Sequence, residues 1–241
     1  MTDAVRTLKE WTDAARKIVF FGGAGVSTES GIPDFRSTGG LYHQEWKYPP
    51  ETILSHTFYK SNPEEFFRFY RAKMLCPDAK PNAAHKKLAE WEREGKLLAV
   101  VTQNIDGLHQ AAGSKNVFEL HGSVHRNYCQ KCGKFFDVNY VVNAKGVPYC
   151  DECGGIIKPD VVLYEEGLDS QTINGAVRAI SKADMLIIGG TSLVVYPAAG
   201  MIDYFKGKYL AVLNRDATSR DKQADLCITD PIGEVLGRIR V

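Results

Sequence analysis

Four cysteines form the clearest chemical pattern in the sequence. They come as two Cys-x-x-Cys pairs with 17 residues between them, Cys129 with Cys132 and Cys150 with Cys153. Thiolates at this spacing are typical of a zinc ribbon, in which four cysteines surround one Zn²⁺ ion as a closed tetrahedron. A closed tetrahedron leaves no position for a substrate or an activated water, so we expect a structural ion. Two disulfides or four free thiols are the alternatives.

A glycine-rich turn follows the first apolar run of the chain. Residues 22–31 read GGAGVSTESG. Glycines between a strand and a helix let the backbone approach a pyrophosphate group, which then lies at the helix N-terminus. A plain structural turn explains the pattern about as well. The dehydrogenase fingerprint is incomplete, because Thr28 stands where its third glycine belongs, and this argues against a standard dehydrogenase.

The segment after this turn brings an aromatic ring and a guanidinium group together. Pro33 stiffens the chain just before Asp34, Phe35 and Arg36. An arginine can hold a phosphate by charge-assisted hydrogen bonds, and a phenyl ring can cover a base or exclude water. A loop salt bridge and a core phenylalanine would explain the same residues if the segment stood alone.

Polar side chains also follow several other apolar runs. These polar ends read TQNIDGLH at 102–109, ELHG at 119–122, GGTS at 189–192 and LNRD at 213–216. The carboxyl ends of parallel strands meet at one edge of a sheet, where open α/β folds bind ligands. His121 is a candidate general base at this edge, because imidazole titrates near neutral pH. A single histidine at a strand end is more often structural, but its polar neighbours favour a functional role.

Apolar runs of strand length alternate with helical patterns along most of the chain. The runs, which we expect to be strands buried on both faces of a parallel sheet, occupy residues 17–22, 98–102, 117–120, 185–189, 209–213 and 226–229. Helical periodicity or capping residues mark residues 5–15, 62–74, 83–93, 171–181 (capped by Ser170), 198–205 and 232–239. The alternation predicts an α/β fold with a Rossmann-like doubly wound parallel sheet.

Two segments interrupt this alternation. Residues 36–80 are helical and aromatic-rich, and residues 123–157 are polar and hold the paired cysteines. We expect the two to form a smaller domain made of a zinc ribbon and a helical insertion. The Rossmann-like domain would then comprise residues 1–35, 81–122 and 158–241.

Composition sets broad limits on the class of protein. The 30 basic and 29 acidic residues leave a net charge of +1, which does not favour a nucleic-acid partner. The charged N-terminal residues lack a signal-peptide core, and no stretch reaches the roughly 20 apolar residues that cross a membrane. We expect a cytoplasmic protein with no membrane and no direct nucleic-acid partner. Cys76 and Cys227 are expected to be ordinary buried thiols.

Taken in order, these segments resemble the sirtuin family. The matching stretches are GAGVSTESGIPDFR, TQNIDGLHQAAG, ELHGSV, the two Cys-x-x-Cys pairs, KPDVVLYEE, GTSLVVYPAA and the strand end at Asn214. They reach from residue 22 to the last helix and so cover essentially the whole chain. The resemblance, to members of bacterial type, implies an NAD⁺-dependent deacylase that acts on proteins or peptides bearing acyl-lysine, with the larger domain binding NAD⁺.

The resemblance also implies roles for individual residues. His121 and Asn104 would be catalytic, His121 as the general base. Contacts to NAD⁺ would come from Ala24, Thr28, Phe35, Arg36, Gln103, Asn104, Ile105, Asp106, Ser192, Asn214 and Ile232. Val162 and Tyr164 would line the acyl-lysine tunnel. The peptide would lie as an added strand between the backbones of 165–167 and 194–196, with contacts from Glu165, Val194 and Val195.

The chemistry that the resemblance implies consumes NAD⁺ as a substrate. The acyl carbonyl oxygen would attack C1′ of the nicotinamide ribose and release nicotinamide. His121 would then take a proton from the ribose, whose hydroxyl attacks the bound amide carbon. The products would be free lysine, nicotinamide and O-acyl-ADP-ribose. Protein mono-ADP-ribosyl transfer and a non-catalytic zinc-ribbon interaction module are the alternatives.

The sequence departs from the family pattern near the acyl group and the peptide. Lys158 stands where many relatives have arginine, and residues 164–166 read Tyr-Glu-Glu instead of the commoner aromatic-Gly-Glu. Members that remove succinyl or malonyl groups carry a tyrosine and, three residues later, an arginine; this chain has Tyr70 and Lys73. The acidic-acyl signature is incomplete, so we expect acetyl to be favoured over succinyl.

Overall fold

The larger part of the chain is built on a parallel sheet of six strands. The computed structural model describes residues 2–37 and 39–239, and its sheet has the order β3-β2-β1-β7-β8-β9. The strands are β1 (Ile18–Gly22), β2 (Leu97–Thr102), β3 (Val117–Glu119), β7 (Met185–Gly189), β8 (Tyr209–Leu213) and β9 (Leu226–Ile228). All five neighbouring pairs are parallel. The expected doubly wound sheet is confirmed, with each strand end within one residue of its predicted position.

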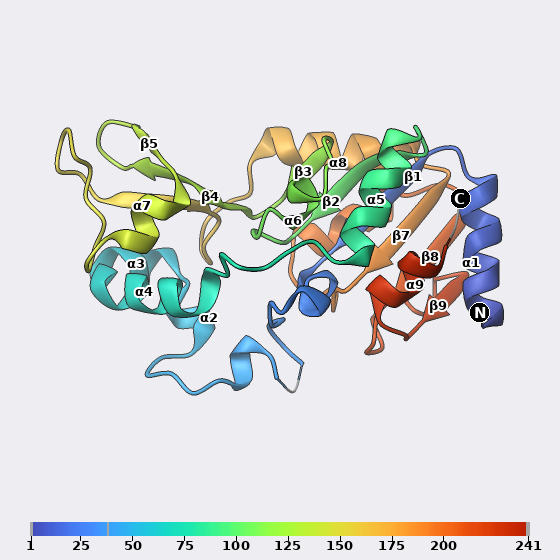
Figure 1. Cartoon of the computed structure of the whole chain (residues 1–241), viewed down its shortest axis with the longest axis horizontal. Coiled ribbons are helices and arrows are strands. Elements are labelled where there is room, and N and C mark those ends of the chain that lie inside the picture. The colour runs from blue at the N-terminus through green and yellow to red at the C-terminus, as the bar shows by residue number, and fades with distance from the viewer. Residues whose placement is uncertain (1, 38, 240–241) are drawn as a thin grey trace.

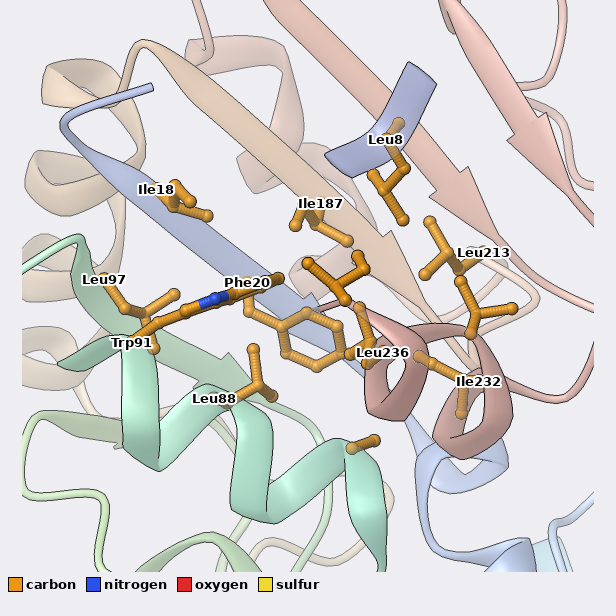
Figure 2. Close-up of a cluster of buried hydrophobic side chains, with 14 of the residues drawn as sticks. Leu8, Ile18, Phe20, Leu88, Trp91, Leu97, Ile187, Leu213, Ile232 and Leu236 are labelled. Atoms are coloured by element: carbon orange, nitrogen blue, oxygen red, sulfur yellow. The ribbon is translucent and has the colours of Figure 1, made fainter. Parts of the chain in front are cut away.

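Helices cover both faces of this sheet. They are α1 (Asp3–Ala14), α5 (Ala83–Arg93), α6 (Leu108–Ala111), α8 (Ser170–Lys182), the 3₁₀ helix η5 (Ala198–Tyr204) and α9 (Ile232–Arg238). Ile18 and Phe20 of β1 pack toward α1, α5 and α9, whereas Val19 and Phe21 pack toward α8 and η5. Figure 2 shows the first cluster, in which side chains of α5 and α9 surround Phe20. Since both faces are buried, the strands are apolar at nearly every position.

Helix α8 begins with a different cap from the one predicted. The side chain of Asp169, not that of Ser170, caps the helix, because its carboxylate accepts bonds from the Thr172 amide (2.7 Å) and hydroxyl (2.8 Å). A carboxylate at this position also interacts favourably with the helix dipole, which a serine hydroxyl does less well. The predicted cap is therefore wrong by one residue.

A smaller antiparallel sheet and a group of short helices form the other end of the molecule (Figure 1). The sheet has the order β5-β4-β6, made of β4 (Gly122–Cys129), β5 (Phe135–Phe136) and β6 (Ile157–Val161). The helices are α2 (Pro50–Ile53), α3 (His56–Ser61), α4 (Pro63–Phe69), a π turn at Tyr70–Met74 and α7 (Val138–Asn143). They share one apolar cluster. A smaller unit with a helical and a cysteine-bearing part is thus present, while its exact boundaries stay a prediction.

The order of the large sheet reverses between β1 and β7. The chain runs outward through β2 and β3 on one side of β1, and through β8 and β9 on the far side of β7. The carboxyl ends of β1 and β7 lie in register, with Gly22 opposite Gly189. In open α/β sheets such a reversal opens a crevice where ligands bind. Among the described residues, no helix is long and apolar enough to cross a membrane.

Candidate active site at the sheet edge

Two glycine turns meet backbone to backbone at the point where the strand order reverses. The Gly25 amide donates to the Gly190 carbonyl oxygen at 2.8 Å. Gly190 has a φ of +58°, and a Cβ there would lie 2.3 Å from the Val26 nitrogen. A Cβ on Gly25 would lie 2.8 Å from the Gly190 Cα. The predicted glycine turn therefore lies at the crevice, and its glycines allow an approach that side chains would prevent.

A cavity of about 490 Å³ opens beside these turns, which is within the range of small-molecule sites. The predicted residues that line it are Ala24, Thr28, Phe35, Arg36, Gln103, Asn104, Ile105, Asp106, His121, Val162, Tyr164, Glu165, Ser192, Val195, Asn214 and Ile232. Val194 is not among the lining residues, and 55% of it is exposed to solvent. The structure thus brings the glycine turn and the polar residues that follow β2, β3, β7 and β8 to one cavity, as the polar strand ends predicted.

Ser27 is a site residue that the sequence analysis did not single out. Its buried hydroxyl donates to Asp106 Oδ2 at 2.7 Å and accepts a bond from Asn104 Nδ2 at 3.1 Å. Asp106 Oδ1 in turn accepts from the Leu108 amide at 2.9 Å. The network joins the glycine turn after β1 to the polar segment after β2. Its only sequence signal is that Ser27 lies between Ala24 and Thr28, both of them predicted contacts.

His121 lies at the junction between the two sheets. Its Nδ1 atom is 3.0 Å from the Gln103 carbonyl oxygen, and its own carbonyl accepts a bond from the Val162 amide at 3.0 Å. Burial lowers the pKa of His121 below its ordinary value, and the bond to Gln103 only partly offsets this. The ring is therefore neutral at physiological pH, as a general base requires.

Gly122 and an ion-pair network fix the position of this junction. Gly122 has a φ of +74°, and a Cβ there would lie 1.9 Å from the Asp160 carbonyl oxygen. Arg126 of β4 pairs with Glu119 of β3 and with Asp160 of β6, each at 2.7 Å. The two sheets are therefore tied together within a few residues of His121.

Phe35 and Arg36 lie on the cavity wall and share a neighbour, Tyr42. The Phe35 and Tyr42 rings meet edge to face with centroids 5.8 Å apart, and the Arg36 guanidinium lies 5.0 Å from the Tyr42 ring centre. Asp34 Oδ1 accepts bonds from the amides of Arg36 (3.1 Å) and Ser37 (2.8 Å), which fixes the turn. Phe35 also packs against the smaller unit's apolar cluster, so the core interpretation holds for part of its surface.

The segment at 163–166 is anchored on the smaller unit. Glu166 accepts bonds from His56 Nδ1 (2.8 Å), Lys158 Nζ (3.0 Å) and the Leu163 amide (2.9 Å). Burial alone would raise the pKa of Glu166, but these bonds lower it below its ordinary value. Lys158, the residue that departs from the family pattern, thus holds this segment in place. Residues 165–167 and 194–196 both lie outside the named strands.

The four paired cysteines converge in the smaller unit. Their sulfur atoms all lie within 4.8 Å of one another, with Cys129–Cys153 at 3.3 Å and Cys132–Cys150 at 3.7 Å. A tetrahedron with Zn–S bonds of about 2.3 Å has edges of about 3.8 Å, whereas a disulfide needs about 2.05 Å. The cysteines therefore fit one structural zinc ion and do not form two disulfides.

The predictions for the other two cysteines are wrong. Cys76 is only partly buried and lines the cavity, and Cys227 is exposed on β9. Strand β9 is the edge strand of the sheet, so its alternate side chains are not all covered. Residue type alone does not distinguish a thiol in a core from one on a cavity wall.

A pair of buried histidines was also missed. His85 of α5 and His109 of α6 have ring centroids 4.7 Å apart and almost no exposed surface. Burial lowers the pKa of His85 to about 4 and that of His109 to about 3. Both are neutral in the folded protein, and neither lines the cavity.

Comparison with known proteins shows the family of the chain. Residues 23–197 match the model of the Sir2 family. The chain is 63% identical to a protein of Clostridium acetobutylicum named NAD-dependent protein deacetylase, over 98% of both chains. It is 61% identical to one of the same name from Clostridium perfringens, over 99% of both. A solved structure of Sir2 with a deacetylated p53 peptide and 3′-O-acetyl ADP-ribose is 38% identical and has a TM-score of 0.90, covering 98% of this chain and 96% of that one. The chain therefore belongs to the Sir2 family, the sirtuins.

Proposed function

We infer that the protein is an NAD⁺-dependent protein lysine deacetylase. It transfers the acyl group from lysine to ADP-ribose and releases nicotinamide and O-acyl-ADP-ribose. The observation that carries this inference is a neutral His121 on the wall of a cavity that also holds the Ser27–Asn104–Asp106 network. Full-length relatives named as deacetylases support the same activity.

The crevice suits a dinucleotide at its glycine turns. The turn after β1 is free of side chains at Gly23 and Gly25, and Ser192, Asn214 and Ile232 line the same cavity. We assign the pyrophosphate region to Ala24, Thr28 and Arg36, and the adenosine half to Ser192, Asn214 and Ile232. Gln103, Asn104, Ile105 and Asp106 would hold the nicotinamide ribose and carboxamide, with Phe35 covering that end. When bound, NAD⁺ supplies the electrophilic ribose carbon and the acceptor hydroxyls.

The base acts through a defined ring nitrogen. A carbonyl oxygen only accepts hydrogen bonds, so His121 Nδ1 donates to Gln103 and carries the proton. The neutral ring then offers its Nε2 lone pair to a proton of the ribose hydroxyl. The bond from Asn104 Nδ2 to Ser27 would fix the Asn104 side chain, which we assign to the nicotinamide end of NAD⁺.

The acyl-lysine would enter beside Val162 and Tyr164, and we expect an acetyl group to be preferred there. Tyr70 is fully buried and does not line the cavity. Lys73 does line it, but its Nζ donates to Gln44 Oε1 at 2.6 Å. An ammonium group already bonded to the Gln44 amide is less free to turn toward the carboxylate of a succinyl group. We expect higher kcat/KM for the acetyl-lysine than for the succinyl-lysine form of one peptide; a succinyl preference would refute this.

The peptide groove is proposed to read backbone more than side chains. Glu165 and Val195 line the cavity, and Val194 is exposed next to it. A peptide laid as an extra strand is held by main-chain hydrogen bonds. N-methylation of the amides that flank acetyl-lysine should therefore raise the peptide KM more than alanine substitution of the same residues. The opposite order would rule out strand addition.

Labelled NAD⁺ separates this function from the alternatives. With an adenine-labelled NAD⁺ and an acetyl-lysine peptide, the label should move from NAD⁺ to O-acetyl-ADP-ribose. This transfer should occur only when the peptide is present. Label on protein would indicate mono-ADP-ribosyl transfer, and an absence of NAD⁺ turnover would indicate a non-catalytic module.

As partners of the protein we propose proteins that carry acyl-lysine, and no nucleic acid. As its location we propose the cytoplasm, where reducing conditions keep zinc thiolates intact.

A further inference from the structure

Two tyrosine hydroxyls meet beside the cavity. The hydroxyl oxygens of Tyr42 and Tyr164 lie 2.6 Å apart, although the residues are 122 positions apart in the sequence. Tyr164 lines the cavity, and Tyr42 stands behind Phe35 and Arg36. The bond therefore links Tyr164, on the wall that we assign to the acyl-lysine, to the residue that contacts Phe35 and Arg36 on the wall that we assign to NAD⁺.

The Tyr164 side of this bond is rigid. The Tyr164 amide donates to the Leu54 carbonyl oxygen and its own carbonyl accepts from the His56 amide, each at 3.0 Å. These bonds form a parallel bridge between Tyr164 and Ser55. Glu166, two residues on, is held by Lys158 and by the same His56. The backbone of Tyr164 is thus held in place on the smaller unit.

The Tyr42 side is joined to Phe35 and Arg36 by backbone bonds and ring contacts. The Tyr42 amide donates to the Phe35 carbonyl oxygen at 2.9 Å, and the Leu41 amide donates to that of Asp34 at 2.8 Å. The Phe35 ring and the Arg36 guanidinium both contact the Tyr42 ring. Burial and the bond to Tyr164 raise the pKa of Tyr42 above its ordinary value, so its hydroxyl keeps its proton.

We propose that the Tyr42–Tyr164 bond is a latch that holds Phe35 and Arg36 in place over the cofactor end of the cavity. Both tyrosines are then positioning residues for NAD⁺, although one belongs to the acyl-lysine wall. The proposal rests on the function inferred above. It implies that an acyl-lysine peptide that contacts Tyr164 changes the affinity for the nucleotide, and by linkage the reverse.

Phenylalanine substitutions test the latch, because each removes one hydroxyl and leaves the ring. We would measure ADP-ribose binding by calorimetry, and KM for NAD⁺ and kcat with an acetyl-lysine peptide, for Tyr42→Phe, Tyr164→Phe and the double variant. Tyr204→Phe, an exposed tyrosine on η5, is the matched control. ADP-ribose lacks nicotinamide, so its binding is measured without turnover.

Each single variant should weaken ADP-ribose binding and raise KM for NAD⁺ by about two- to tenfold, the range of one neutral hydrogen bond. For Tyr42→Phe, at a residue outside the acyl-lysine wall, the change in KM for NAD⁺ should exceed the change in kcat. The double variant should be no weaker than the worse single variant, since both remove the same bond. Single variants with wild-type values, or effects that multiply in the double variant, would overturn the latch. A wild-type protein that does not turn over NAD⁺ would instead refute the proposed function.

Discussion

The Nδ1 atom of His121 lies 3.0 Å from the carbonyl oxygen of Gln103, the residue that follows β2. The Gln103 amide donates to the Gly22 carbonyl oxygen at 3.0 Å, and its side chain donates to Thr191 Oγ1 at 3.0 Å. Gln103, which orients the ring that we assign as the base, is therefore itself held by residues at the ends of β1 and β7. This relationship sets both the tautomer of His121 and its place on the cavity wall.

Replacing this ring should separate chemistry from binding. His121→Ala removes the proton acceptor, so kcat for deacetylation should fall at least about 100-fold. The other cavity residues remain, so the dissociation constant for ADP-ribose should stay close to that of the wild type. Calorimetry and a peptide deacetylation assay check the two quantities. Near-normal turnover in the variant would refute the assignment of the base.

The rate should fall at acid pH with an unusually low midpoint. Burial lowers the pKa of His121, and the base acts only when it is unprotonated. The acid limb of kcat/KM should therefore have its midpoint below the ordinary histidine value of about 6.5. A pH–rate profile at constant ionic strength measures it. A midpoint at or above the ordinary value would contradict the burial argument.

Acid should also destabilise the fold through His85 and His109. Their pKa values are lowered to about 4 and about 3, so the unfolded chain binds more protons than the folded one below about pH 6.5. Stability is fully present above that pH and falls as the pH drops toward 4. We expect each histidine to cost up to about 2 kcal/mol between pH 7 and pH 5.

Urea unfolding of the wild type and of His109→Phe at both pH values checks this. Phenylalanine cannot be protonated and keeps a ring next to Phe20, whose centroid lies 6.2 Å from that of His109. The variant should lose less stability than the wild type between the two pH values. Equal losses would show that His109 is not the group responsible. The same data show whether the protein is still folded at the pH at which its rate falls.

Removing the metal should disturb the structure of the smaller unit and should have no direct effect on the chemical step. Cys150→Ser should lower the zinc content and disorder the sheet of β4, β5 and β6, because the free energy of zinc binding contributes to folding. Activity should fall as a consequence, since β4 continues directly from His121. Cys227→Ser, at an exposed thiol, should keep both zinc and activity. Full zinc content in Cys150→Ser would refute the four-cysteine site.

The sequence predicts those parts of the site that depend on local patterns. The strands are recognisable because both faces of the sheet are buried, and the polar strand ends gather because parallel strands point the same way. The bonds from Ser27 to Asp106 and from Tyr42 to Tyr164 join residues 79 and 122 positions apart. Such contacts depend on how loops pack in three dimensions, and no spacing along the chain reveals them. The exposure of Cys227 and the place of Cys76 on the cavity wall escape prediction for the same reason.

The most direct test of the proposed reaction is mass spectrometry of a mixture of the protein, NAD⁺ and an acetyl-lysine peptide. The transfer of the acetyl group from lysine to ADP-ribose predicts equal amounts of deacetylated peptide, nicotinamide and O-acetyl-ADP-ribose. Free acetate with NAD⁺ unchanged, or ADP-ribose attached to the peptide or the protein, would contradict it.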